Sequence, residues 1–212
     1  GINEFIICAG YKAEVIKKFF HKYFINNTDI TIDLKNNDII YHNNTSEDWK
    51  VTIVDTGKDT MTGGRLNRVK KFIDDDFCFT YGDGLSDVNI SELIKFHKSN
   101  KSIATLTAVQ TPERFGTLTL DDNNKVQDFK EKPLSHDNWI NGGFFVLTPE
   151  IFNFIDGDKT IFEKNVLEKL SIEKELSAFV HNGFWHAMDK ISDKKNLETL
   201  WLNNLAPWKL WL

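Results

Sequence analysis

The chain is poor in the residues on which disulfide-stapled and zinc-binding proteins depend. Its 212 residues include 2 cysteines, 2 methionines and 4 prolines. Cys8 and Cys78 both lie in apolar, strand-like stretches and show no Cys-x-x-Cys spacing. This placement predicts buried, reduced thiols and argues against a disulfide framework or a zinc site.

The chain also lacks an excess of positive charge and a long apolar run. Lys and Arg together number 26 against 31 Asp and Glu, which gives a net charge of −5 without a basic stripe. A nucleic-acid groove is therefore not expected. No apolar run approaches the roughly 20 residues that span a bilayer. We predict a cytoplasmic protein that acts on a small molecule, with neither nucleic acid nor membrane as a partner.

The sequence is rich in apolar strand and helix patterns, including 17 Phe and 6 Trp. The run Phe5–Cys8 is followed by Gly10 and by an i, i+3/i+4 apolar stripe over Val15–Phe24, which predicts a strand leading into a helix. Similar strands and helices alternate along the chain, and Asn36-Asn37 is placed to close a hairpin. No linker or repeat interrupts them. We predict one α/β domain over residues 1–212.

The most informative segment is Thr80–Gly84, which follows the apolar run Phe77–Phe79. We interpret it as a central strand that delivers Asp83 to the carboxyl edge of a sheet, where α/β proteins bind ligands. The alternative is an Asp-Gly turn between two strands.

A second acid, Asp189, follows the aromatic segment Gly183–Met188. One sheet edge can bring Asp83 and Asp189 together if both end strands. Two carboxylates, completed by phosphate oxygens and water, suit Mg²⁺, a hard ion that seldom takes all its ligands from protein. The acidic run Asp74–Asp76 precedes a strand instead of ending one, so we interpret it as a solvated loop.

Three further segments could approach a ligand, and each has a structural alternative. Thr62–Arg65 opens a helix with two glycines, so a flat ring or a ribose could reach its N–H groups, although Thr62 could simply be an N-cap. Glu131–Pro133 could hold a sugar hydroxyl and a phosphate, or form a surface ion pair. Asn141–Gly143 places glycines in an apolar strand, either for close approach to the backbone or for a β-bulge.

These segments together resemble the sugar-phosphate nucleotidylyltransferases, and among them the glucose-1-phosphate cytidylyltransferases. The similarity runs through the whole chain, and the motifs occur in the family's order. They are Val54–Gly57, Met61–Leu66, Thr80–Gly84, Arg114–Gly116, Glu131–Pro133, Ile140–Val146 and Ala206–Lys209. The resemblance implies a Rossmann-like α/β fold with a mixed, mostly parallel sheet flanked by helices, and a homo-oligomer.

The resemblance also implies the reaction and the roles of residues. CTP and α-D-glucose 1-phosphate would give CDP-glucose and pyrophosphate, in nucleotide-sugar and O-antigen biosynthesis. Asp83 and Asp189 would hold Mg²⁺, and Lys132 would be the third catalytic residue. The implied nucleotide-binding residues are Thr62, Gly63, Gly64, Arg65, Thr80, Tyr81 and Gly82. The implied sugar-phosphate-binding residues are Gly116, Glu131, Lys132, Asn141, Gly142 and Gly143.

One departure from the family concerns the triphosphate. The family begins with a strand and a glycine-rich loop containing Gly-Thr-Arg and then a Lys-Pro pair, whereas Gly1 begins at what resembles the second strand. We therefore expect a fragment that lacks its first β-α unit and is poorly active as written. Two alternatives stay open: a uridylyl- or thymidylyltransferase of the same fold, and a non-catalytic nucleotide-sugar-binding subunit.

Overall fold

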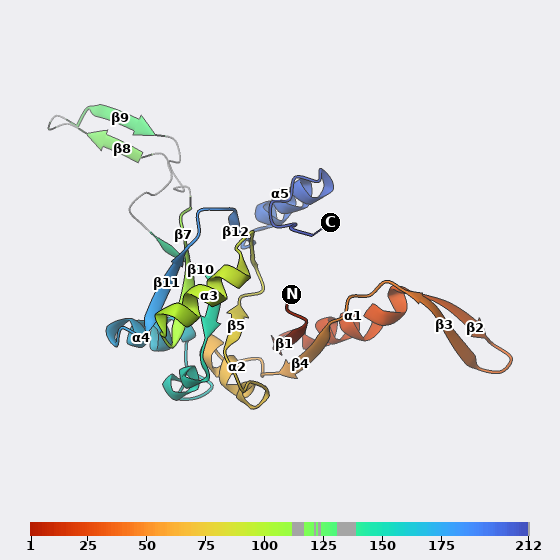
Figure 1. The fold of residues 1–212 in the computed structure, drawn as a ribbon. Helices are drawn as coiled ribbons and strands as arrows, with labels where there is room; N and C mark the ends of the chain where they lie inside the picture. Colours follow the sequence, from red (N-terminus) through yellow and green to blue (C-terminus); the bar gives the residue numbers. More distant parts are fainter. Residues whose placement is uncertain (112–116, 121, 123, 131–138, 212) are drawn as a thin grey trace. The chain divides into compact units, whose positions relative to one another are not determined.

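The computed structural model describes residues 1–111, 117–120, 122, 124–130 and 139–211 (Figure 1). The chain divides into two compact units. The first comprises Gly1–Asp74 and Phe152–Glu168, and the second comprises Asp75–Ile151 and Lys169–Leu212. Across the described ranges, no helix is both long enough and apolar enough to pass through a bilayer.

The first unit is built on two parallel strands joined by a helix. Strand β1 (Glu4–Ala9) pairs with β4 (Lys50–Asp55), and helix α1 (Ala13–Asn26) lies between them in the chain. Ala9 pairs with Asp55, so both strands end at the same edge. The loops that begin at Gly10 and Thr56 therefore start side by side, at the type of edge where α/β proteins bind ligands.

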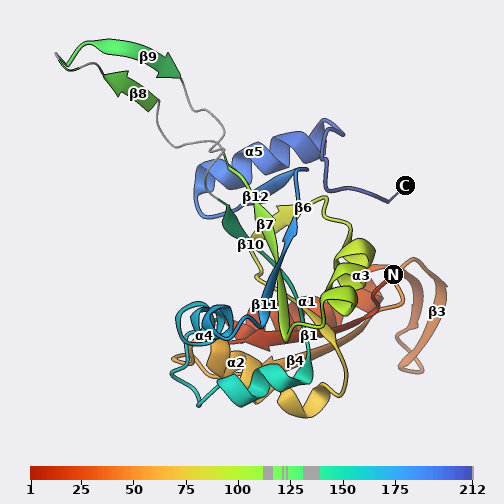
Figure 2. The same ribbon diagram turned by 60° about the vertical axis from the view of Figure 1, so that its left-hand side comes forward.

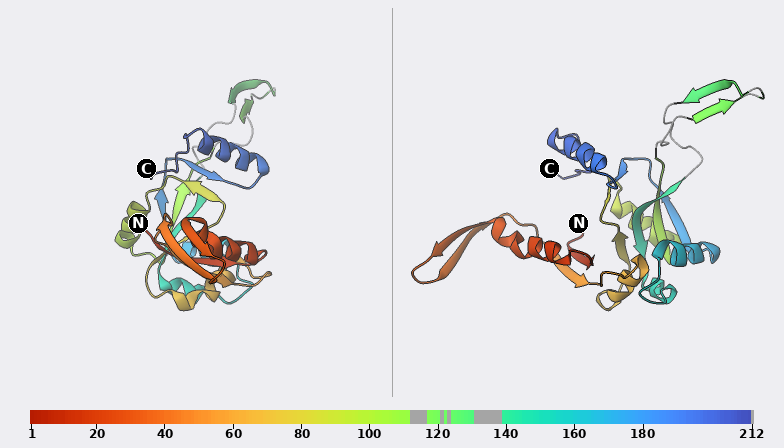
Figure 3. Two further views of the ribbon diagram at one scale, coloured as in Figure 1. Left: turned by 90° about the vertical axis from the view of Figure 1, so that its right-hand side faces the viewer. Right: turned by 180° about the vertical axis from the view of Figure 1, so that it is seen from behind.

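An antiparallel hairpin follows α1 in the same unit (Figure 3). Its strands are β2 (Thr28–Asp33) and β3 (Asp38–Asn44). Asn37 has φ of 55°, a left-handed conformation that Asn tolerates better than most residues. The prediction that Asn36-Asn37 closes a hairpin is confirmed.

Short helices complete the first unit. Helix α2 (Thr62–Arg68) is followed by the 3₁₀ turn η1 (Lys70–Phe72) and packs against η3 (Phe162–Leu167). Two further helical segments, η2 (Pro149–Phe154) and α4 (Glu168–Ile172), cross the boundaries between the units along the chain.

The second unit contains a four-stranded mixed sheet in the order β11-β7-β10-β5. Strand β10 is antiparallel to β5 and β7, and β11 is parallel to β7, so three strands share one direction. Helix α3 (Ile90–Asn100) packs along this sheet (Figure 1). The predicted mixed α/β fold is confirmed. The strands are β5 (Phe77–Thr80), β7 (Ala104–Val109), β10 (Ile140–Leu147) and β11 (Leu176–Val180).

The position of β5 differs from the prediction of a central strand. In the described residues β5 forms an edge of the sheet, with β10 as its neighbour. An edge strand leaves part of its surface in solvent, and Cys78 is exposed whereas Cys8 is half-buried. Both thiols are free. The expectation of a buried thiol is therefore wrong for Cys78.

Two smaller ladders also belong to the second unit. Strand β6 (Gly84–Ser86) pairs antiparallel with β12 (Trp185–Ala187), and helix α5 (Ile191–Leu202) follows β12 (Figure 2). Strands β8 (Thr117–Leu120) and β9 (Val126–Lys130) form a hairpin.

The core beneath α3 contains a histidine. His97 is 2% exposed, and its Nδ1 lies 2.8 Å from the hydroxyl of the fully buried Thr105 on β7. Burial lowers the pKa of the His97 imidazole, an effect that the nearby Asp76 carboxylate opposes. Neutral His97 is thus part of the packed core, because the charged form would lose its hydration.

We expect this histidine to make the fold acid-sensitive. The unfolded imidazole binds a proton at about pH 6.5, but native His97 binds it only at lower pH, so unfolding takes up a proton. Above about pH 6.5 His97 should not lower the free energy of unfolding, and below this pH the free energy of unfolding should fall as the pH drops. Urea unfolding at several pH values would measure the slope. His97→Asn should flatten it, and His21→Asn on exposed α1 should not; equal slopes in all three proteins would contradict the assignment.

Candidate active site

The two predicted metal ligands lie at the same end of the β6–β12 ladder. Ala187 pairs with Gly84, and one step further the Met188 N–H donates to the Asp83 carbonyl at 2.8 Å. Asp189 is the next residue, and both carboxylates are exposed. Asp83 connects β5 to β6, but these strands pair with β10 and β12 respectively, so it is not the tip of a hairpin.

These two carboxylates fit a magnesium ion by their chemistry. Within the described part of the chain, neither side chain has a hydrogen bond or ion pair that occupies its oxygens. Mg²⁺ binds hard oxygen ligands such as carboxylates that are not already hydrogen-bonded by the protein, and phosphate oxygens and water complete its coordination shell. The same described ranges contain no group of three or more His, Cys, Asp or Glu residues arranged around a metal.

The segment Asn141–Gly143 contacts residues that precede each acid in the second unit, Tyr81 before Asp83 and Trp185 before Asp189. The Gly143 carbonyl accepts from the Tyr81 N–H at 3.4 Å, and the Gly142 carbonyl accepts from the Trp185 indole N–H at 2.6 Å. Strand β10 is thereby linked to the segment before Asp83 and to β12. The sequence analysis did not predict this role of Trp185. The only indication in the sequence was an aromatic residue a few positions before Asp189.

The glycines of β10 have a structural explanation. The register shifts between Asn141 and Phe145, so the alternative of a bulge is confirmed. Gly143 has φ of 76°, and a Cβ there would lie 2.7 Å from the Tyr81 ring. A Cβ on Gly142 would lie 3.0 Å from the Thr107 carbonyl. A sugar-binding role for this segment stays a prediction.

The start of α2, in the first unit, is engaged with the chain itself. The Thr62 hydroxyl accepts from the Phe162 N–H and donates to the Glu163 carboxylate, both at 2.9 Å. Thr62 is the first residue of α2 and Met61 is its N-cap, so the alternative of a Thr62 N-cap is wrong. The hydroxyl instead satisfies the first N–H of η3, which has no other cap.

The expectation of free N–H groups at the two glycines of α2 is also wrong. The N–H groups of Gly63 and Gly64 both donate to the Thr160 carbonyl, at 3.0 and 3.3 Å. Both glycines are buried, and a Cβ on Gly64 would lie 2.5 Å from the Asp158 carbonyl oxygen. Their small size lets α2 pack on the 158–160 segment. Nucleotide binding by these residues stays a prediction.

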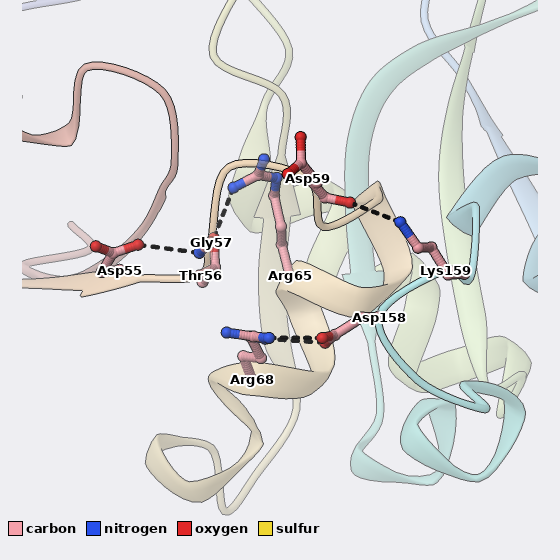
Figure 4. Close-up of polar contacts among 8 residues, drawn as sticks. All are labelled: Asp55, Thr56, Gly57, Asp59, Arg65, Arg68, Asp158 and Lys159. Atoms are coloured by element: carbon pink, nitrogen blue, oxygen red, sulfur yellow. Dashed lines mark hydrogen bonds and ion pairs between the residues drawn. The ribbon is translucent and has the colours of Figure 1, made fainter.

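Arg65 turns back toward the carboxyl ends of β1 and β4 (Figure 4). Its Nη1 donates to the Thr56 hydroxyl at 2.8 Å and to the Ala9 carbonyl at 3.4 Å, and its Nη2 donates to the Lys58 carbonyl at 3.2 Å. Burial raises the pKa of the nearby Cys8 thiol, although the Arg65 charge acts in the opposite direction. Cys8 is therefore protonated at neutral pH.

Arg68 makes a bidentate ion pair with Asp158 that the sequence analysis did not predict (Figure 4). Its Nε and Nη2 donate to the two carboxylate oxygens of Asp158, at 2.9 and 2.5 Å. These hydrogen bonds hold the pKa of the Asp158 carboxyl below its ordinary value. The partners are 90 positions apart, so no local pattern could have paired them.

The remaining predicted site residues are not described. Gly116, Glu131 and Lys132 lie outside the described residues, together with Arg114 and Pro133. Of the predicted set, the structure brings together Thr80–Asp83, Asn141–Gly143 and Asp189 in the second unit. Thr62–Arg65 lies in the first unit.

A family model described as nucleotidyl transferase matches residues 41–193. The chain belongs to the nucleotidyl transferase family. Membership of this family agrees with the α/β fold and with the two carboxylates at one end of the β6–β12 ladder. It confirms the resemblance that the sequence motifs indicated.

Among curated relatives, the glucose-1-phosphate cytidylyltransferases of Salmonella typhi and Salmonella typhimurium are each 48% identical to this chain over 213 residues. The alignments cover 100% of this chain and 82% of theirs. The probable glucose-1-phosphate cytidylyltransferase of Bacillus subtilis is 38% identical, over 100% of this chain and 83% of its own. The crystal structure of HddC from Yersinia pseudotuberculosis superposes with a TM-score of 0.62 over 92% of this chain and 77% of its own; at 20% identity it supports the fold alone.

The packing of α2 can be tested with two glycines. Gly64→Ala should lower the free energy of unfolding by about 1–3 kcal/mol, because its Cβ would overlap the Asp158 backbone. Gly82→Ala is the matched control, since a Cβ there has nothing within 4 Å. Urea unfolding of both variants measures the difference. Equal midpoints would show that the close approach of α2 to residue 158 is not present in solution.

Proposed function

We propose that this chain transfers a cytidylyl group from CTP to α-D-glucose 1-phosphate, giving CDP-glucose and pyrophosphate. The observation that carries the proposal is the 48% identity, over the whole chain, to two proteins named glucose-1-phosphate cytidylyltransferase. The hydrogen bonds that connect Tyr81 to Gly143, Trp185 to Gly142 and Asp83 to Met188 support it, because they link segments that the resemblance assigns to the substrates and to the metal.

The reaction requires no protein nucleophile. A phosphate oxygen of glucose 1-phosphate attacks the α-phosphorus of CTP, a new P–O bond forms, and the bond between the α-phosphorus and the bridging oxygen breaks as pyrophosphate leaves. Such a displacement depends on alignment of the two phosphates and on neutralisation of their charge. Residues that hold phosphates in line are therefore sufficient.

Asp83 and Asp189 are the residues that would hold Mg²⁺ in this proposal. The bound ion would supply positive charge to the phosphate oxygens as pyrophosphate leaves. Their carboxylates suit the role because they are exposed, adjacent on one ladder and unengaged among the described residues. Lys132 is proposed to contribute a second positive charge, and Glu131 and Gly116 to bind the sugar phosphate.

Further expectations accompany this proposal. The resemblance implies a cytoplasmic homo-oligomer that acts in nucleotide-sugar and O-antigen biosynthesis. The resemblance assigns Thr62–Arg65 and Thr80–Gly82 each to nucleotide binding, and Asn141–Gly143 to sugar binding, and these assignments are part of the proposal.

The reaction can be tested by pyrophosphate release with glucose 1-phosphate and Mg²⁺, measured for this chain and for one extended upstream of Gly1 by the family's first β-α unit. We expect turnover with CTP and at least about tenfold less with UTP or dTTP, because one exocyclic group on the base is worth a hydrogen bond. Preference for UTP or dTTP would overturn the cytidylyl assignment. The absence of pyrophosphate release from the extended chain with all three nucleotides would overturn the assignment of an enzyme activity.

The metal site can be tested by removing one carboxylate charge at a time. Asp83→Asn and Asp189→Asn should each reduce Mg²⁺-dependent turnover by about 100-fold or more, with the thermal midpoint little changed, because both side chains are exposed. Asp75→Asn, in the exposed run before β5, is the matched control and should retain activity. A variant at 83 or 189 that kept full turnover would exclude that residue from the metal site.

A further inference from the structure

The β6–β12 ladder has two ends, and only one of them carries the candidate metal ligands Asp83 and Asp189 (Figure 2). At the opposite end the Asp87 N–H donates to the Phe184 carbonyl at 3.2 Å. Each strand has three residues, so few backbone hydrogen bonds hold the ladder. A contact that fixes the opposite end would therefore also fix the end with the two acids.

His181 connects the main sheet to this opposite end. It directly follows β11, and its N–H donates to the Ala108 carbonyl of β7 at 2.9 Å. Its imidazole Nε2 lies 3.3 Å from the Phe184 carbonyl and 3.2 Å from the Ser86 hydroxyl. A carbonyl oxygen can only accept, so Nε2 carries a hydrogen. The His181 side chain is thus a donor directed at both chains of the ladder.

The same nitrogen faces the carboxylate of Asp87. His181 Nε2 lies 2.9 Å from Asp87 Oδ1, and the His181 side chain is 11% exposed. This oxygen is enclosed by protein, and no well-aligned hydrogen bond reaches it from the described residues. A buried carboxylate oxygen is costly unless a donor or a positive charge lies close to it. The proximity of His181 therefore offsets the burial of this oxygen.

Gly183 packs against this contact. A Cβ on Gly183 would lie 2.4 Å from Asp87 Oδ1 and 2.6 Å from His181 Cε1. Gly183 does not have a positive φ, so the backbone conformation does not require a glycine. The close approach of the Asp87 and His181 side chains accounts for it instead. A side chain at this position would displace one or both of them.

We propose that Asp87 and His181 are positioning residues: their contact fixes the opposite end of the β6–β12 ladder, and thereby holds Asp83 and Asp189 in place for a divalent cation. Neither residue binds the cation in this proposal. The consequence for the cation rests on the proposed function, whereas the fixing of the ladder does not.

The first test measures the ladder without substrate or metal. The Met188 N–H, which donates to the Asp83 carbonyl, reports opening of the ladder, and the Thr148 N–H, which donates to the Ile103 carbonyl at 2.9 Å, reports opening of the main sheet. In Asp87→Ala, hydrogen exchange at Met188 should be at least about tenfold faster, with less than about threefold change at Thr148, because the ladder opens locally.

Two further variants keep this test decisive. Gly183→Ala retains both side chains but displaces their contact, so the same acceleration at Met188 is expected, including where Asp87→Ala does not fold. Asn182→Ala is the matched control, because Asn182 is exposed in the same connection and should leave the exchange unchanged. Unchanged exchange at Met188 in the folded variants would overturn the proposal, as would equal acceleration at Met188 and Thr148.

The double variant Asp87→Ala, His181→Ala tests whether the two residues act together. Removal of His181 alone leaves the enclosed carboxylate oxygen without its donor, so His181→Ala should accelerate exchange at Met188 at least as much as Asp87→Ala. The double variant should exchange no faster than His181→Ala, because the partners share one contact. Additive accelerations would mean two independent roles and would overturn the proposed contact.

The second test measures the consequence for the cation in the chain extended upstream of Gly1. Asp87→Ala and Gly183→Ala should each raise the Mg²⁺ concentration for half-maximal turnover at least about fivefold. Saturating Mg²⁺ should restore kcat, and the KM for glucose 1-phosphate should stay within about twofold. Gly183→Ala retains the Asp87 charge, so a shift in both variants reports position and not charge. A general loss of folded protein would lower kcat without changing the Mg²⁺ requirement.

The outcomes are distinct from those of the cytidylyl assignment. Faster exchange at Met188 with an unchanged Mg²⁺ requirement would overturn the positioning role, and so would a shift in Asp87→Ala alone. An extended wild-type chain without turnover on any nucleotide would instead remove the proposed function. The exchange measurement would then still decide whether Asp87 and His181 fix the ladder.

Discussion

The antiparallel pairing of β6 with β12 is the constraint on which the candidate metal site depends. It joins two three-residue strands that lie about one hundred positions apart in the chain, and it places Asp83 and Asp189 at one end of the ladder. The Trp185 indole then connects β12 to the Gly142 carbonyl of the main sheet. Because a short ladder is held by few hydrogen bonds, this side-chain contact is an important support for it.

Glycines in this protein mark close packing of the chain on itself. Gly63 and Gly64 let α2 approach Thr160 and Asp158, and Gly143 makes room for the Tyr81 ring. Gly10 likewise leaves room for the Arg65 guanidinium group to pack against its backbone. A glycine in an apolar segment signals that something approaches the backbone, but the approaching group can be protein or ligand, and the sequence contains no information on which it is.

Prediction succeeded where the signal was periodic or local. The apolar stripe of α1, the hairpin closed by Asn36-Asn37 and the strand over Ile140–Leu147 could all be read from spacing and turn residues. It failed for the position of β5, which was expected at the centre of the sheet and lies at its edge in the described residues. The four residues of β5 alternate between half-buried and exposed, so the apolar run Phe77–Phe79 did not indicate the coverage that a central strand has.

The sequence by itself determined the alternation of strands and helices, the membership suggested by motifs in a fixed order, and the presence of an acid after each of two aromatic strands. Only the tertiary structure decided which strands pair, that the Gly63 and Gly64 N–H groups donate to Thr160, and that Arg65 holds Thr56 and Lys58. The physical reason is the range of the interactions. Periodicity and turn preferences act over a few residues, whereas strand pairing, ion pairs and close packing join positions whose proximity follows only from the folded chain.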